Sequence, residues 1–516
     1  MARRPIALTA LSAVAAAVLA AGPARAEGDS MRYEEPQDPH YFRSIFEILA
    51  INVIGNVDYL LNTADRGGTA HPGDRLWDLR YDWPTFHDKL TGELWRKDSN
   101  QFNTNYIAHP MAGALYYTAA RSNHLTWLES FAFSTLGSFA WEYFAEMREV
   151  VSLNDAIVTP AAGFAIGETT MQLGDFFSRS SATIPNRVVA ALFAPLRAIN
   201  DLADGGRPRR DGDYDPLGLT RGPWHRFEVG AGARMMVQRG LVRPERTVYA
   251  APRVALDARV VNIPGYGSAG QGLRLFEDGN VSRLQFDLSW MGGRVADATF
   301  STKVVPVGVF YHDAPTIAHD GLRGSEAIFG YMATFEYSAH DYDRDGGRPV
   351  DVYSIASPLG IYGEYTYRRG RAWIRPEIEV SANFAGITSY GLGAYRASRG
   401  LDVNIPSVLA EKAYYHGYGA TAAGGVTLGY GPVEIGSRAR VDTVRTIEGF
   451  DEKPRATLTN VDDRRVVSSG WCRVSVPGTG WSVRVDAEAR QREGTVGQGR
   501  AAKGEVALMG MTSWRF

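Results

Sequence analysis

Four side chains in the first third of the chain could act together as acids, bases or metal ligands. They are His109, Glu142, Glu146 and Asp155. Histidine and carboxylate groups are common general acids and bases in hydrolysis, and they also bind divalent metals. One hypothesis is therefore a catalytic site made of all four residues. A metal site made of His109, Glu142 and Glu146 is an alternative, and no cofactor follows from these residues.

A structural network is the competing interpretation, and the sequence favours it. No nucleophile elbow, H-E-x-x-H motif or phosphate loop supports a known mechanism. On a helix expected at 125–148, every fourth residue is polar, which makes one narrow seam on an otherwise apolar surface. Because unpaired buried polar groups cost ~1–3 kcal/mol each, we expect partners to bury this seam. The seam consists of Ser130, Ser134, Ser138, Glu142 and Glu146.

Proline residues indicate where the neighbouring helices begin. Pro110 is a good first helical residue, so His109 should lie at the positive helix start, where a neutral imidazole is favoured. Arg121 lies at the far end of this helix. Residues 159–160, Thr-Pro, predict the start of another helix that leads to Glu168. Three glycines would let these helices approach closely: Gly113, Gly163 and Gly167.

The motifs of this region resemble those of a known family. They read DSNQFNTNYIAHPMAGALYY at 98–117, WEYFAE at 141–146, SLND at 152–155 and TPAAGFAIGE at 159–168. This succession is similar to DUF3943, a family of exported bacterial proteins of unknown function, over about residues 40–180. The resemblance implies a domain organisation and a candidate site, and it implies no reaction.

The N-terminus predicts export. Arg3 and Arg4 precede an apolar run, and a small-x-small cleavage signature ends at Ala26. The run is shorter than the ~20 residues that a spanning helix needs, so a signal peptide at 1–26 is favoured over an anchor. The composition adds two exclusions. With 55 Lys+Arg against 57 Asp+Glu we expect no nucleic-acid partner, and the single Cys472 cannot form an internal disulfide.

The C-terminal half has a different periodicity. A Gly-, Pro- and charge-rich stretch at 204–222 predicts a linker between a helical domain at 40–203 and a second domain at 223–516. In the second domain apolar and polar residues alternate, as where Ile378 and Val380 oppose Glu379. About 12 strands are expected, at roughly 226–239, 247–261, 281–292, 294–311, 326–338, 351–367, 371–386, 413–429, 431–445, 464–475, 480–491 and 503–516.

These strands are long enough to cross a bilayer. A tilted membrane strand needs ~9–11 residues, and in lipid such strands must close into a barrel because unpaired edge amides are costly. The expected fold class is therefore α+β multidomain, with an N-terminal helical domain followed by an antiparallel transmembrane β-barrel. A soluble β-sandwich is the alternative, although its strands would be shorter and its polar face less densely charged.

The last strand carries a further signal. In 505–516, Val506, Leu508, Trp514 and the terminal Phe516 share one face. This pattern resembles the C-terminal signal of bacterial outer-membrane barrels. The resemblance implies an outer-membrane location, contact with outer-membrane lipid, and insertion by the barrel-assembly machinery through the strand that ends in Phe516.

Three functional classes remain open. The first is a structural or envelope-interaction barrel with a helical plug or periplasmic domain, and a helix at 40–62 is expected to pack against or partly inside the barrel. The others are a lipid- or cell-wall-modifying hydrolase with its His/Glu/Asp site in the helical domain, and a small-solute transporter. Lumen positions carry both signs, as in Arg484 with Asp486 and Glu488, which indicates a cross-linked interior rather than a conduction pore.

Overall fold

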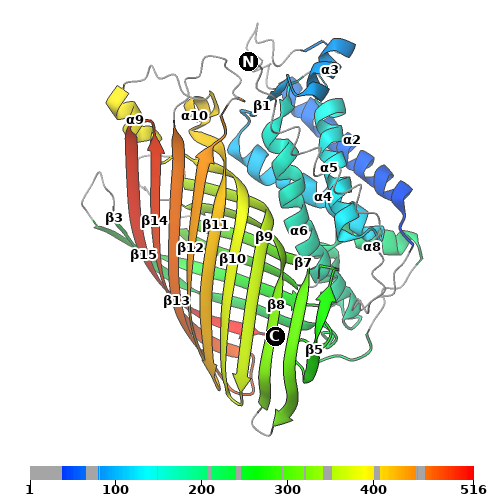
Figure 1. The fold of residues 1–516 in the computed structure, drawn as a ribbon, viewed down its shortest axis with the longest axis vertical. Coiled ribbons are helices and arrows are strands. Elements are labelled where there is room, and N and C mark those ends of the chain that lie inside the picture. Colours follow the sequence, from blue (N-terminus) through cyan, green and yellow to red (C-terminus); the bar gives the residue numbers. More distant parts are fainter. Residues whose placement is uncertain are drawn as a thin grey trace.

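The computed structural model describes residues 38–65, 79–80, 82–147, 149–205, 211–239, 246–279, 281–291, 294–318, 321–340, 351–399, 407–448, 450 and 460–516. The predicted signal peptide lies outside these ranges. Within them, an N-terminal helical region is followed by a closed antiparallel β-barrel (Figure 1). The expected fold class is confirmed.

The helical region consists of helices of varied length and two short strands. The helices are α2 (Tyr41–Asp65), α3 (Trp83–Thr91), the π-helix η1 (Thr104–Ala108), α4 (His109–Ser122), α5 (Trp127–Ala140), the π-helix η2 (Trp141–Ala145), α6 (Leu153–Arg179), α7 (Ile184–Phe193) and α8 (Pro195–Ala203). Strands β1 (Trp95–Arg96) and β2 (Val151–Ser152) pair in parallel. Among the described residues, no helix has the length and apolar character needed to span a membrane.

One expected helix start is wrong, and the other is correct in position but is not a free helix end. Helix α6 begins at Leu153 and not at 159–160, because the Ser152 hydroxyl accepts the backbone N–H of Asp155 and caps the helix earlier, which leaves Pro160 inside it. His109 begins α4, but η1 precedes it and the His109 backbone N–H donates to the Thr104 carbonyl. His109 therefore does not lie at a free, positive helix end.

The close approach of α4 and α6 is confirmed. A Cβ atom on Gly113 would lie 1.9 Å from the carbonyl oxygen of Thr159, and one on Gly163 would lie 2.4 Å from the Gly113 backbone. Only glycine fits at both positions. The two helices therefore pack backbone against backbone, and their polar side chains meet at the ends of this contact.

Twelve strands close the barrel. They are β3 (Trp224–Arg239), β4 (Arg246–Val261), β6 (Val281–Met291), β7 (Arg294–Ala318), β8 (Gly321–His340), β9 (Asp351–Arg369), β10 (Ala372–Thr388), β11 (Tyr414–Tyr430), β12 (Val433–Thr446), β13 (Val461–Ser475), β14 (Trp481–Val496) and β15 (Gly499–Arg515). Neighbours pair in chain order, β15 pairs with β3, and β7 also pairs with β8, which closes the ring. Each predicted strand is present within a few residues.

Three further elements were not expected from the sequence. Strand β5 (Gly270–Phe276) pairs with β7 beside the ring. Helices α9 (Leu392–Arg399) and α10 (Ser407–Lys412) lie between β10 and β11 at one end of the barrel (Figure 1). Leu392 and Leu409 from these helices pack with Tyr415 and Val496 in one buried cluster, so apolar side chains are buried at this end of the barrel.

The predicted alternation of faces is confirmed. On β10, Ile378 and Val380 are 59% and 50% exposed, whereas Glu379 between them is buried. Glu379 forms an ion pair with Lys303 of β7, which is not a neighbour of β10 in the ring. Ion pairs between non-neighbouring strands must cross the lumen. The charged face is therefore the inside of the barrel and the apolar face is the outside.

The helices pack against the outside of the barrel. Phe164 of α6 lies in one buried cluster with Val304 and Phe335, and it stacks on Tyr331. Val304 directly follows the inward Lys303, so it points outward. The helical plug considered above is therefore wrong for the described helices, because the charged side chains of the strands themselves fill the lumen. Figure 1 shows α6 running obliquely beside β7, β8 and β9.

Candidate functional site

The four candidate residues lie near one another, where η1, η2, β2 and the start of α6 meet. The His109 Nε2 atom lies 3.6 Å from Asp155 Oδ2. The Glu142 Oε2 atom accepts the backbone N–H of Ser152 at 2.7 Å. The charges of Glu146 and Asp155 also raise the pKa of Glu142. The structure therefore brings together the four side chains that were singled out from the sequence.

Asp98 joins this cluster and was not among the candidates. Its backbone N–H donates to Asn154 Oδ1 at 2.8 Å, and Asn154 Nδ2 donates to Asp155 Oδ1 at 3.0 Å. Asp98 and Asp155 are both buried, and the charge of Asp155 raises the pKa of Asp98. The clue to Asp98 in the sequence was that it is the first residue of the first family motif. We name Asp98, His109, Glu142, Glu146 and Asp155 the acidic cluster.

Burial and like charge dominate the electrostatics of the acidic cluster. Burial, and for Asp98 also the charge of Asp155, raises the pKa of Asp98 and of Asp155 to about 7. Burial and the neighbouring Glu146 raise the pKa of Glu142 well above its ordinary value. Burial lowers the pKa of His109, so its imidazole is neutral. The cluster therefore keeps protons on its carboxyl groups near neutral pH instead of carrying several negative charges.

A buried lysine closes the cluster on one side. Lys89 of α3 is 1% exposed, and its Nζ donates to the carbonyl oxygens of Glu142 at 3.1 Å and Glu146 at 2.9 Å. A cation at the last carbonyls of a helix is stabilising, and here it ends η2. The sequence showed that Glu142 and Glu146 needed a cation, a metal or a shared proton. It gave no sign that Lys89 was the cation.

The described residues do not assemble a set of ligands for the metal site that was the alternative. In the part of the chain that the structure describes, no three His, Cys, Asp or Glu side chains come together in a way that could hold a metal ion. Glu142 Oε2 faces a backbone N–H, and its Oε1 atom is buried without a hydrogen-bond partner. A buried carboxyl oxygen of this kind fits a protonated acid better than a metal ligand.

Polar contacts tie the acidic cluster to the outer wall of the barrel. His416 of β11 lies 2.9 Å from the Asp98 carbonyl oxygen through Nε2 and 2.6 Å from the Tyr106 hydroxyl through Nδ1. Because a carbonyl only accepts, Nε2–H donates to Asp98 and Nδ1 accepts from Tyr106. Asn105 donates to the Tyr414 hydroxyl at 3.0 Å. The helices and the barrel therefore share one buried polar junction.

A second group on the helices is a compensated ion pair. Arg121 binds Glu168 through two nitrogens at 2.8 and 3.0 Å, and the Tyr117 hydroxyl donates to Glu168 at 2.6 Å. Burial acts to raise the pKa of Glu168, but the charge of Arg121 and the hydrogen bonds to Glu168 together lower it. Arg121 also binds Asp278, which lies between β5 and β6, at 3.0 Å. The two residues named from the sequence are therefore partners, in a link between helices and barrel.

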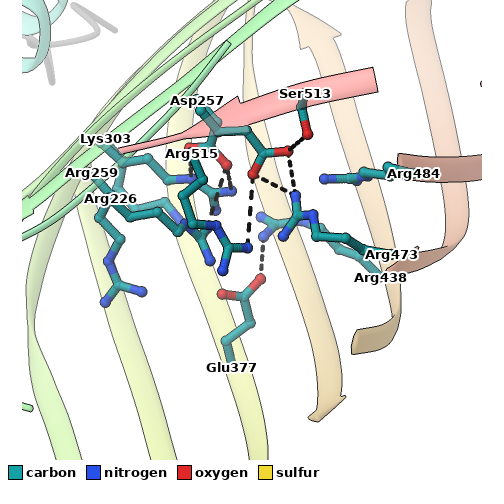
Figure 2. A network of polar contacts seen from close by, with 12 residues as sticks. Arg226, Asp257, Arg259, Lys303, Glu377, Arg438, Arg473, Arg484, Ser513 and Arg515 are labelled. Carbon is teal, nitrogen blue, oxygen red and sulfur yellow. Dashed lines mark hydrogen bonds and ion pairs between the residues drawn. The ribbon is translucent and has the colours of Figure 1, made fainter. Parts of the chain in front are cut away.

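The barrel lumen holds the largest group of charged residues. Arg473 of β13 binds Glu228 of β3 at 2.5 Å and Glu434 of β12 at 2.8 Å. In Figure 2, Arg473 points toward the centre from one side, and Asp257 and Arg226 from the other. Arginine side chains and carboxylates are therefore paired within this network.

Further pairs continue along the lumen. Arg259 of β4 binds Glu364 of β9 at 2.9 Å, Glu336 of β8 pairs with Arg440 and Arg465, and His340 of β8 lies 2.7 Å from both Asp297 and Glu505. One cavity of about 220 Å³ lies among them, lined by charged and hydroxyl side chains. This volume is below the ~300–1,000 Å³ of typical small-molecule sites. The predicted cross-linking of opposite charges inside the barrel is confirmed.

Solved structures with a similar barrel share little sequence with this chain. OmpTdeltaL8, an outer membrane protein of Vibrio cholerae, is 9% identical, covers 57% of this chain and 100% of its own, and has a TM-score of 0.20. The beta domain of the Bordetella autotransporter BrkA is 13% identical, with the same coverage and a TM-score of 0.24. The translocator domain of the autotransporter NalP from Neisseria meningitidis is 12% identical, covers 65% of this chain and 100% of its own, and has a TM-score of 0.21.

The sequence comparisons concern the helical region. No curated protein matches the chain. Residues 94–196 match the family DUF3943, described as a domain of unknown function. The matched segment runs from β1 to the start of α8 and contains the whole acidic cluster. The resemblance drawn from the motifs is confirmed for this part of the chain.

Proposed function

We propose that the protein is an outer-membrane barrel with a closed lumen, and that its role is structural or in interactions within the envelope. The observation that carries the proposal is the set of ion pairs across the lumen. Arg473 with Glu228, and Arg259 with Glu364, connect strands that are not neighbours in the ring, and all four side chains are buried. A barrel tied together in this way supports a surface or a partner better than it passes a solute.

A conductance measurement distinguishes this role from that of a small-solute transporter. The purified protein would be inserted into planar bilayers, with insertion checked by flotation of the same preparation in vesicles. We expect no stepwise current, because paired charges of both signs occupy the lumen and apolar residues of α9 and α10 are buried at one end of the barrel. Stable open-channel currents from inserted protein would support the transporter and overturn the proposal.

We further propose insertion by the barrel-assembly machinery through the last strand. The backbone groups of Phe516 exchange two hydrogen bonds with Phe227, both of 2.9 Å, and the Phe516 ring packs on Phe227 and Trp514. Deletion of Phe516 removes the last contact that closes β15 on β3. We expect a lower yield of assembled barrel in membranes. Phe516→Tyr, which keeps an aromatic end, should assemble as the parent does, and an unchanged yield after the deletion would contradict the proposal.

For the acidic cluster we propose a structural role instead of hydrolysis. Three of its carboxyl groups accept a hydrogen bond from the protein itself: Glu142 accepts from Ser152, Asp98 accepts from Asn100, and Asp155 accepts from Asn154. Asp98, Glu142 and Asp155 are 5% exposed or less. A hydrolytic site would need an opening toward its substrate, whereas a structural junction needs this burial. The variants that test the choice are given in the Discussion.

A further inference from the structure

The outer face of α2 carries large apolar side chains. Phe42 and Phe46 are 89% and 72% exposed, and Leu49, Val53 and Val57 are each more than half exposed. Their spacing of four, three, four and four residues places all five on one side of the helix. A helix that faces water would show polar residues here.

The polar residues of α2 point the other way. Arg43 binds Asp204 at 2.6 Å, and the buried Asn52 accepts a hydrogen bond from Tyr116 of α4 at 3.2 Å. Ser44 is fully buried. The helix is therefore inverted with respect to water, with its hydrophilic side against the protein and its apolar side on the surface.

Neighbouring helices repeat this inversion. Ile184 and Leu192 of α7 are 78% and 74% exposed, and Leu202 of α8 is 81% exposed. On α5, the polar seam from Ser130 to Ser138 is buried, whereas Leu136 is 63% exposed. An exposed apolar surface shared by several helices marks an interaction with another apolar phase or partner.

The position and length of this surface indicate its partner. Helix α6 lies on the outer wall of the barrel and α2 packs on α4 and α5, while the barrel strands also expose apolar side chains, such as Leu359 at 63% and Ile378 at 59%. The stripe from Phe42 to Val57 is about 22 Å long at 1.5 Å per residue. The apolar band of membrane barrels is ~25 Å tall. The apolar stripe of α2 is thus nearly as long as this band is tall.

We infer that the outer face of α2, with the adjoining faces of α7 and α8, contacts the acyl chains of the membrane around the barrel. This inference rests on the proposed outer-membrane location. On that side the barrel meets lipid through a layer of helices, and the acidic cluster lies between the lipid-facing layer and the barrel wall. The polar junction is then shielded from both water and lipid.

Lipid-phase quenching tests the inference with a control that the protein already contains. Cys472, the single cysteine, is exposed on β13 between Ile435 and Val485, both of which face outward. A bimane label on Cys472 reports whether the barrel wall contacts lipid. In a Cys472→Ser background, Phe46→Cys and Val53→Cys place the label on α2, and Ala397→Cys on the exposed part of α9 gives the aqueous reference. All proteins are reconstituted in phosphatidylcholine vesicles with and without doxyl-labelled lipid.

The outcomes separate this inference from the proposed location. We expect labels at Phe46 and Val53 to lose as much fluorescence to doxyl lipid as the label at Cys472, with a similar blue shift. Labels on α2 that behave like the one at Ala397, while Cys472 is quenched, would overturn the inference and leave the barrel in the membrane. If Cys472 itself escapes quenching, the proposed location fails and the inference with it. Cysteines on α2 that cross-link two copies and resist quenching would assign this face to self-association and overturn the inference.

Discussion

The lumen of the barrel and the acidic cluster both bury charged groups, but they neutralise them differently. In the lumen, a carboxylate such as Glu228 or Glu364 meets a guanidinium from another strand at 2.5–2.9 Å. In the acidic cluster, carboxyl groups outnumber cations, and burial raises the pKa of Asp98 and Asp155 to about 7. Charge pairing in the lumen and bound protons in the acidic cluster both reduce the electrostatic cost of burying carboxyl groups. The two regions should therefore respond differently to mutation and to pH.

The largest effect is expected from breaking a lumen ion pair. Arg473→Ala leaves Glu228 buried without its main cation, which costs ~3–5 kcal/mol of folding free energy. Urea unfolding of the barrel from vesicles measures this loss. Arg464→Ala, on the same strand but exposed, is the matched control and should change stability by less than about 0.5 kcal/mol. Equal effects at both positions would contradict a paired, buried lumen.

A charge on the outside of the barrel should be the next most damaging change. Val485 is 48% exposed on the outer wall, beside the buried Asp486. Val485→Arg should destabilise the barrel by ~2–4 kcal/mol if the site lies near the bilayer midplane. Val485→Leu, which stays apolar, is the control. Full tolerance of the arginine in vesicles would mean that this face does not meet lipid.

In the acidic cluster, removing a proton-bearing group should cost less than breaking a lumen pair. Glu142→Ala leaves the buried Ser152 N–H without an acceptor, at ~1–3 kcal/mol, and His109→Ala should also lower the thermal stability of the helices. Glu142→Gln keeps the acceptor and imitates the protonated acid, so it should melt close to the parent. An alanine variant as stable as the parent but defective in an assay of detergent sensitivity would favour the hydrolase.

The smallest effect is a pH dependence of the helical region. Because the pKa values of Asp98 and Asp155 lie at about 7 in the folded state and near 3.8 when unfolded, the folded state binds more protons between about pH 4 and 7. This contribution to stability is complete below about pH 4 and is lost as pH rises through 7. Hydrogen exchange in residues 98–155 should be slower at pH 5 than at pH 8 after correction for intrinsic rates.

Asp155→Asn is the control for this pH dependence. The amide cannot titrate, so the difference in protection between pH 5 and pH 8 should shrink in the variant. Protection that rises with pH in the parent would show that the acidic cluster is stabilised as carboxylates. It would then resemble the lumen, and the contrast between the two regions would disappear.

The fold was readable from the sequence where a local period decides it. Two-residue alternation fixes which side of each strand is apolar, as at Ile378 and Glu379, and twelve strands followed from it. Four-residue spacing predicted the buried seam that runs from Ser130 to Glu142. These patterns depend on near neighbours alone, so one sequence is enough to find them.

Contacts between distant segments could not be predicted in this way. Lys89 lies 53 residues from Glu142 in sequence and His416 lies 318 residues from Asp98, and no local pattern marks these residues as partners. The position of the helices outside the barrel depends on α6 packing against Val304 and Phe335. The exposed apolar face of α2 was a visible clue, since a helix inside a polar lumen would have turned its polar side outward.

The central claim is that the C-terminal half is a closed barrel in a membrane, and heat-modifiable migration tests it most directly. Unheated protein extracted from membranes in mild detergent should migrate differently from boiled protein in gel electrophoresis, because the closed barrel resists the detergent until it is heated. Arg473→Ala should lower the temperature at which the two forms interconvert. Protein recovered in a soluble periplasmic fraction, with the same migration before and after boiling, would contradict the account.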